Sequence, residues 1–118
     1  MDKKEILIAL EEWNCDIKGA LERFIEDEEL YVTCLTMLTE DHNFEKLGIA
    51  LKEKDAAAAF DYAHTLKGVF ANLGLIPMLS SVTTIVEPLR AGMAEHLEES
   101  YQELLKEKEK LKGILEKN

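Results

Sequence analysis

The sequence predicts an all-α fold, an antiparallel four-helix bundle with additional short N-terminal helices. Apolar residues recur at spacings of three and four along most of the 118 residues, which is the period of an amphipathic helix. Strand signals are nearly absent, because the chain has no Asn-Gly or Asp-Gly hairpin and no sustained alternation of apolar and polar residues. Four substantial helical segments with short connections favour antiparallel neighbours.

The size and composition of the chain predict a single domain over residues 1–118. Hydrophobic residues make up 47% of the sequence and charged residues 32%, which is globular composition with enough apolar material for a core. A chain of this length is long enough for one compact domain and too short for two ordinary ones.

The N-terminal third is expected to hold three helices. The first covers Lys3 to Glu12, and Asp16 is placed as the N-cap of a short second helix, "IKGALERFI". Asp27 is placed as the N-cap of the third, "EELYVTCLTMLTED". The residues expected on its apolar side are Leu30, Cys34, Leu35 and Leu38.

A fourth segment, Phe44 to Lys54, either continues the third helix through "DHN" or follows a break there. Its pattern turns four apolar residues inward: Leu47, Ile49, Ala50 and Leu51. Asp55 then caps a helix that runs to about Leu73 and stops at Gly74.

Two prolines mark the next helix. Pro77 belongs in its first turn, where the missing N–H does no harm, and the helix should bend or end near Pro88. The last helix is expected from about Glu95 to Glu116, with its apolar pattern interrupted at Lys108. Its apolar residues are Leu97, Tyr101, Leu104, Leu111 and Leu115.

The charge balance disfavours two classes of partner. Asp and Glu total 24 against 14 Lys and Arg, a formal net charge of −10, which disfavours nucleic acid and anionic membranes. Cys15 and Cys34 are too far apart for a CxxC motif, and we expect reduced thiols in the cytoplasm. The N-terminal apolar run is short and broken by acids, so it predicts neither a signal peptide nor an anchor.

The stretch "AHTLKGVFANLG" contains a histidine that points away from the core. On a helical wheel, His64 shares its side with Ala57, Phe60, Lys67, Gly68 and Ala71. The opposite side carries the expected core stripe: Ala59, Tyr62, Leu66, Val69, Phe70 and Leu73. His64 is therefore expected at the surface.

These residue types suit a phosphoryl acceptor. Unperturbed imidazole is largely neutral near pH 7 and is then a competent nucleophile. Lys67, one turn from His64, can bring its ammonium group to an anion on the ring, and Gly68 leaves the approach open. A docking face for the donor protein is expected at Ala57, Phe60, Asp61 and Ala71.

The run "HTLKGVFANLG" resembles the signature of histidine-containing phosphotransfer (HPt) domains. In that family the histidine is followed by lysine three positions on, glycine four on and a second glycine ten on; His64, Lys67, Gly68 and Gly74 fill these places. The upstream stretch "DIKGALERFIEDEELYVTCL", with Leu21 and Phe24, is similar to the entry segment of the family. The resemblance so defined covers nearly all 118 residues.

The resemblance implies a phosphorelay role. His64 would be the phosphoacceptor in a four-helix bundle, exchanging the group with response-regulator receiver domains or with a hybrid histidine kinase. The domain would have no catalytic activity and no cofactor of its own, because the receiver supplies the aspartate and the magnesium site. Phe70 stands where many members have a small residue; it should alter packing only. We expect a monomer.

Two alternatives compete with the relay. Asp61 and His64 are one turn apart, a spacing used by metal ligands, but the chain has no Glu-x-x-His, and His42 and His96 show no matching spacing, so no metal is predicted. A helical adaptor that is never phosphorylated stays open, although it leaves Gly68 unexplained.

A free-standing protein is favoured over part of a larger kinase, since the sequence begins at Met1 and no ATP-binding segment follows. An excised domain would look the same.

Overall fold

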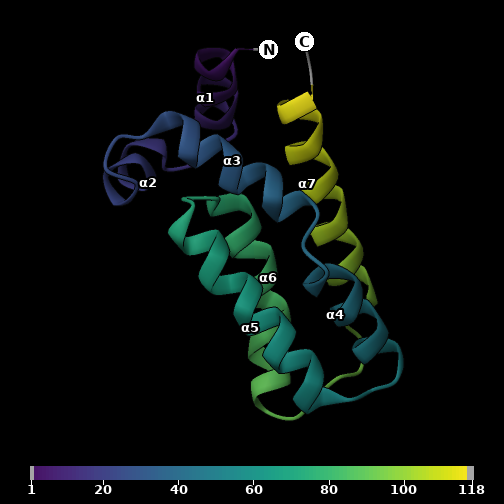
Figure 1. Cartoon of the computed structure of the whole chain (residues 1–118). Helices are drawn as coiled ribbons and strands as arrows, with labels where there is room; N and C mark the ends of the chain where they lie inside the picture. Colours follow the sequence, from purple (N-terminus) through teal and green to yellow (C-terminus); the bar gives the residue numbers. More distant parts are fainter. Residues whose placement is uncertain (1, 117–118) are drawn as a thin grey trace.

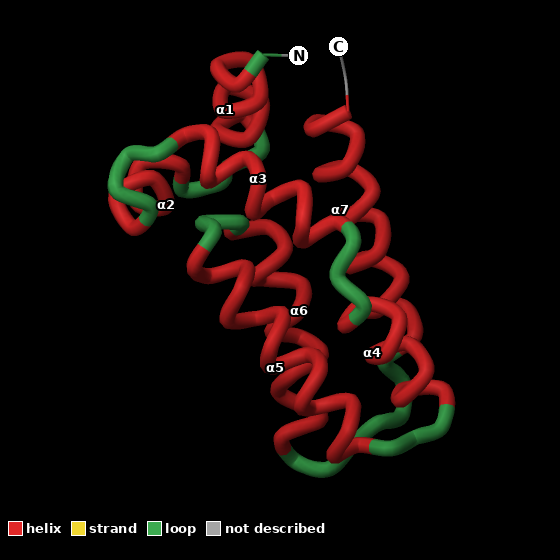
Figure 2. The backbone as a smooth tube through the Cα atoms, in the orientation of Figure 1, coloured by secondary structure: helices red, strands yellow, loops and turns green. Residues whose placement is uncertain are grey.

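The computed structural model describes residues 2–116, and within this range the secondary structure is entirely helical (Figures 1 and 2). The element bounds are α1 (Lys3–Glu12), α2 (Ile17–Arg23), α3 (Glu28–Thr39), α4 (Asn43–Lys52), α5 (Ala56–Asn72), α6 (Ile76–Arg90) and α7 (Glu98–Glu116).

Aspartate side chains set the first residues of three helices, as the sequence predicted. The carboxylates of Asp16, Asp27 and Asp55 each accept a hydrogen bond from the backbone N–H three residues on, at 3.0, 3.0 and 3.1 Å. Each bond satisfies one of the N–H groups that the first helical turn leaves without a partner. α2, α3 and α5 therefore begin where the local signals placed them.

Four helices, α4 to α7, form an antiparallel bundle, which confirms the predicted fold class (Figure 1). α5 packs against both α4 and α6, α6 packs against α7, and α4 contacts α7. The three N-terminal helices lie at one end, where α1 and α3 contact α7. α5 is thus covered by α4 on one side and by α6 on the other, and the side between them is exposed.

One hydrophobic cluster runs through the whole described chain. It contains fully buried residues from all seven helices and one from a connection: Leu10, Ala20, Leu35, Leu47, Leu66, Leu75, Ile85 and Leu104. Within residues 2–116 the buried set holds no polar or charged residue. The N-terminal helices therefore share their core with the bundle.

Two residues expected in the core are at the surface instead. Leu30 on α3 is 47% exposed and Ile49 on α4 is 51% exposed. Tyr31 on α3 and Phe44 on α4, which the sequence pattern did not assign to the core, are buried instead. On α3 the buried face is Tyr31, Leu35 and Leu38, which continues the three-and-four spacing when read from Tyr31.

Helix boundaries depart from expectation where the backbone turns left-handed. Ile25 and Glu26 have φ of 53° and 59°, so α2 ends at Arg23 rather than at Ile25. His96 has φ of 64°, so α7 begins at Glu98 and not at Glu95. A left-handed residue cannot continue a right-handed helix, which is why each forms a boundary.

The open question at "DHN" resolves as a break. α3 ends at Thr39, and the Asp41 carboxylate accepts a hydrogen bond of 2.8 Å from the backbone N–H of Asn43, the first residue of α4. Such a side-chain bond two residues on stabilises a turn in place of a continued helix.

The two prolines of α6, and Lys108, which interrupts the apolar pattern of α7, lie where a helix tolerates them. Pro77 is at the start of α6, and Pro88 lies in its last turn, two residues before the helix ends at Arg90. Lys108 is half-buried in α7 with its ammonium group 5.3 Å from the centre of the Phe44 ring. A cation over an aromatic face explains how lysine interrupts the apolar pattern without loss of packing.

Candidate functional site

The side chain of His64 is exposed on α5, as the helical wheel predicted. The buried residues of this helix are Ala59, Ala63, Leu66 and Phe70. Tyr62 and Val69, expected in the core, are only half-buried, while Ala63 is completely buried. The core face is thus rotated towards Ala63, because α5 is covered by two neighbouring helices rather than by one.

Gly68 leaves open space one turn beyond His64. A Cβ atom built at Gly68 would meet no atom within 4 Å, so nothing in the fold requires glycine there. Lys67 is half-buried and forms no salt bridge within residues 2–116, so its ammonium group remains available to an anion. A nucleophile, a free cation and an open approach lie within one helical turn.

The ring of Phe60 stacks on the imidazole of His64. Their centroids are 5.4 Å apart and their planes differ by 12°, and the guanidinium carbon of Arg90 on α6 is 5.3 Å from the centre of the Phe60 ring. The helical period predicts Phe60 on the docking face, whereas no local pattern indicates Arg90. Only the antiparallel register of α5 and α6, which brings the start of one helix to the end of the other, could have indicated it.

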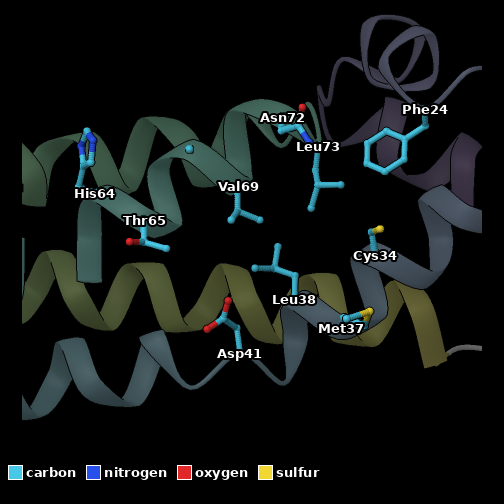
Figure 3. A pocket seen from close by; sticks show the side chains of 11 residues that line it. Phe24, Cys34, Met37, Leu38, Asp41, His64, Thr65, Val69, Asn72 and Leu73 are labelled. Carbon is cyan, nitrogen blue, oxygen red and sulfur yellow. The ribbon is translucent and has the colours of Figure 1, made fainter. Parts of the chain in front are cut away.

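A groove of about 810 Å³ opens between α3 and α5, with His64 at one end (Figure 3). Most of its lining is apolar, and Met37, on the α3 side, is 67% exposed. The sequence pattern gave no sign of this groove, because its walls come from separate helices. The lining residues are Phe24, Cys34, Met37, Leu38, Asp41, His64, Thr65, Gly68, Val69, Asn72 and Leu73.

Gly74 terminates α5 in a left-handed conformation, with φ of 70°. The N–H of Leu75 bonds to the carbonyl of Phe70 at 2.9 Å, and that of Gly74 to the carbonyl of Ala71 at 3.2 Å. This pair of bonds is a Schellman motif. A Cβ at Gly74 would also collide with the backbone carbonyl oxygen of Asp16, so glycine is required twice over.

Side chains from the N-terminal helices hold the end of α5. Arg23 donates from Nε to the carbonyl of Asn72 at 2.9 Å and from a terminal nitrogen to that of Ala71 at 3.1 Å. The buried Tyr31 hydroxyl donates to the carbonyl of Leu73 at 2.7 Å. α5, the helix that carries His64, is therefore fixed at its C-terminal end, which lies nearest α2 and α3 (Figure 1).

The remaining residues of the predicted docking face lie at the surface of α5. Ala57, Asp61 and Ala71 are all exposed, and the backbone carbonyl of Asp61 accepts a hydrogen bond of 2.9 Å from the Thr65 hydroxyl. Their contact with a partner remains a prediction.

Other chemistries find less support in the described chain. Within residues 2–116 no group of three or more His, Cys, Asp or Glu is placed to hold a metal ion. Burial raises the pKa of the Cys15 thiol to about 11, which keeps it protonated and unreactive near neutral pH. None of the described helices is both long enough and apolar enough to cross a membrane.

Comparison with protein-family models finds one described as "Hpt domain", which matches residues 29–113. The match contains His64, Lys67, Gly68 and Gly74, and it begins in α3. Leu21 and Phe24, quoted for the expected resemblance of the entry segment, therefore lie outside the matched residues. Comparisons with curated proteins and with solved structures found no match.

Proposed function

The chain belongs to the Hpt domain family of phosphocarrier modules in two-component signalling, and from this premise we propose that His64 is its phosphoacceptor. The observation that carries the proposal is the exposed imidazole beside the empty space at Gly68. A helical adaptor would need no nucleophile at this position. A transfer reaction needs a nucleophile that a second protein can reach.

The proposed step joins a neutral imidazole to the phosphorus of an aspartyl phosphate. A ring nitrogen lone pair forms the N–P bond, the bond between phosphorus and the aspartate oxygen breaks, and the carboxylate leaves with that electron pair. The proton on the other ring nitrogen stays in place. The reverse step passes the group to a second receiver, so the domain acts as a carrier without activity of its own.

Lys67 is proposed to offset the charge of the transferred group. Its ammonium group has no carboxylate partner within the described residues, and it lies one turn from the imidazole. A phosphoryl group in transfer carries negative charge on its peripheral oxygens, and a nearby cation lowers the energy of that state.

The proposed partners are receiver domains, which would dock over His64. The apolar groove between α3 and α5 adjoins the imidazole and offers contact area next to the predicted face of Ala57, Phe60, Asp61 and Ala71. Magnesium belongs to the receiver in this proposal, so the chain needs no cofactor. Exchange with a hybrid histidine kinase would use the same imidazole.

The test is intact-mass analysis after incubation with receiver domains charged by acetyl phosphate and Mg²⁺. We expect a gain of one phosphoryl group that is stable to alkali, labile to acid and absent in His64→Gln.

The other two histidines provide matched controls. His42 and His96 are exposed and lie outside α5, so His42→Gln and His96→Gln should be labelled as fully as the wild type. No gain with any receiver would contradict the proposal and favour the adaptor.

A further inference from the structure

We propose that Phe60 and Arg90 are positioning residues for His64: the guanidinium group holds the Phe60 ring, and the ring holds the imidazole in one orientation. This inference rests on the proposed function of His64 and adds a second helix to the site, because Arg90 comes from the end of α6.

The first contact is between the two rings. Phe60 and His64 are four residues apart on α5, so their side chains lie on the same face one turn apart. A centroid distance of 5.4 Å with an interplanar angle of 12° is offset stacking, a preferred geometry for aromatic pairs. An exposed imidazole would otherwise rotate among several rotamers; the stack selects those parallel to Phe60.

The second contact fixes Phe60 itself. Arg90 lies 5.3 Å from the centre of the Phe60 ring, inside the range of cation–π attraction. Its Nε is also 3.5 Å from Oε2 of Glu87, one turn earlier on α6, so the guanidinium contacts a carboxylate as well as the ring. Phe60 is half-buried, which leaves its ring fewer positions than a fully exposed one.

Orientation matters most when the donor is a docked protein. A receiver bound in the groove presents its phosphoryl group from one direction, so the attacking nitrogen must point along that line. A small donor in solution can align itself with the ring nitrogen in whatever orientation the imidazole adopts. The stack should therefore affect transfer from a receiver and leave labelling by phosphoramidate, a small phosphoryl donor, unchanged.

The experiment compares single-turnover transfer from a charged receiver with labelling by phosphoramidate. Phe60→Leu keeps an apolar side chain without the ring, and Phe60→Tyr keeps the ring. At saturating receiver we expect Phe60→Leu to slow transfer about tenfold, since small misplacements of reacting groups cost this much or more. Phe60→Tyr should transfer at nearly the wild-type rate, and all variants should be labelled equally by phosphoramidate.

Two further variants complete the set. Arg90→Met removes the cation and should slow receiver transfer about threefold, as expected for loss of a surface cation–π contact. Tyr62→Leu removes a half-buried aromatic ring from the other side of α5 and should change nothing. In proton NMR, the ring-current shift that Phe60 imposes on the His64 ring protons should persist in Phe60→Tyr and vanish in Phe60→Leu.

Distinct results would overturn the inference. Positioning would be excluded if Phe60→Leu transferred at the wild-type rate at saturating receiver, or if Phe60→Leu and Tyr62→Leu slowed transfer equally. It would also be excluded if Phe60→Leu changed only the receiver concentration that gives the half-maximal rate. If the wild type itself accepts nothing from any receiver, the proposed function fails and the positioning role fails with it.

Discussion

At the scale of the residue, Gly68 is the clearest sign that the site was shaped for a partner. Glycine inside a helix costs about 1 kcal/mol relative to alanine. A Cβ at this position would meet nothing within 4 Å, so packing gives no reason for the residue. Access to His64 supplies one, and the cost is of the kind that functional sites impose on stability.

Substitution of Gly68 should therefore separate stability from transfer. We expect Gly68→Ala to raise the free energy of unfolding by about 0.5–1 kcal/mol in urea denaturation. Gly68→Gln should fold normally and slow transfer from a receiver at least about tenfold, because its side chain occupies the approach.

Gly113 provides a matched control, since it is also an exposed helical glycine with nothing within 4 Å. Gly113→Gln should leave transfer unaltered. Transfer at the wild-type rate in Gly68→Gln would refute the access role.

Lys67→Ala should weaken the site without abolishing it. Lys67 supplies charge near the phosphoryl group and forms no bond in the step, so we expect acceptance to slow about tenfold, or about 1.4 kcal/mol of barrier. The measurement is the rate of phosphoryl gain by intact mass, with Lys112→Ala on the exposed face of α7 as control. Complete loss of labelling in a folded Lys67→Ala protein would show that the lysine has a different role.

The residues of the site divide by how local their signals are. His64, Lys67 and Gly68 lie on one helix, so the period of that helix was enough to predict that the histidine is exposed. Arg90 and Met37 reach the site from α6 and α3, and no local pattern encodes which helices become neighbours. The stacking of Phe60 on His64 and the groove between α3 and α5 could therefore be found only from the structure.

At the scale of the element, hydrogen bonds from the N-terminal part of the chain hold the C-terminal end of α5, the helix that carries His64. Arg23 and Tyr31 donate to its last carbonyls, and the backbone N–H of Asp16 donates to the carbonyl of Gly74 at 2.8 Å. Arg23 and Tyr31 thereby satisfy the carbonyls of Asn72 and Leu73, which lie in the last turn, where a helix leaves its carbonyls without intrahelical partners. The N-terminal helices thus hold one end of the helix that carries His64.

Gly74→Ala should be much more destabilising than a comparable change elsewhere. It adds a Cβ to a left-handed residue, with φ of 70°, and forces it against the Asp16 carbonyl, so we expect a loss of about 2–4 kcal/mol.

Gly92→Ala is the matched control, because Gly92 has φ of 81° but nothing within 4 Å, so only the conformational cost of about 1 kcal/mol applies. Urea denaturation of both variants measures the difference. Equal losses would mean that contact with Asp16 contributes nothing.

The starts of α2, α3 and α5 were predictable from the sequence and several other features were not, for a physical reason. An N-cap is a local bond between neighbours in sequence, so Asp16, Asp27 and Asp55 could be assigned directly. The exposure of Leu30 and the left-handed turn at His96 depend on how distant helices meet. Propensity carries no information on those contacts.

At the scale of the whole molecule, three ionisable groups lie in the shared core or pack against it, and burial favours their neutral forms. Burial is the largest cause that raises the pKa of Cys15, from 9.0 to about 11, and burial likewise raises the pKa values of Tyr31 and Tyr101 above 10.0. The hydroxyls of both tyrosines donate hydrogen bonds to backbone carbonyls, which their ionised forms could not do.

Stability should accordingly decline in alkali. A group with a raised folded-state pKa contributes fully below its unfolded pKa, and the contribution is lost as pH rises. For Cys15 this window runs from about pH 9 to 11. We expect the urea midpoint to fall over this range and to fall less in Cys15→Ala; an equal decline in that variant would exclude the thiol as a cause.

The central claim, that His64 carries a phosphoryl group between receivers, is tested most directly by discharge. The protein is phosphorylated by one receiver, purified, and mixed with a second, uncharged receiver and Mg²⁺ while both masses are followed. We predict that the phosphoryl group leaves His64 and appears on the receiver at a matching rate. A phosphoryl group that maps to another residue, or that stays on the protein with every receiver tried, would contradict the account.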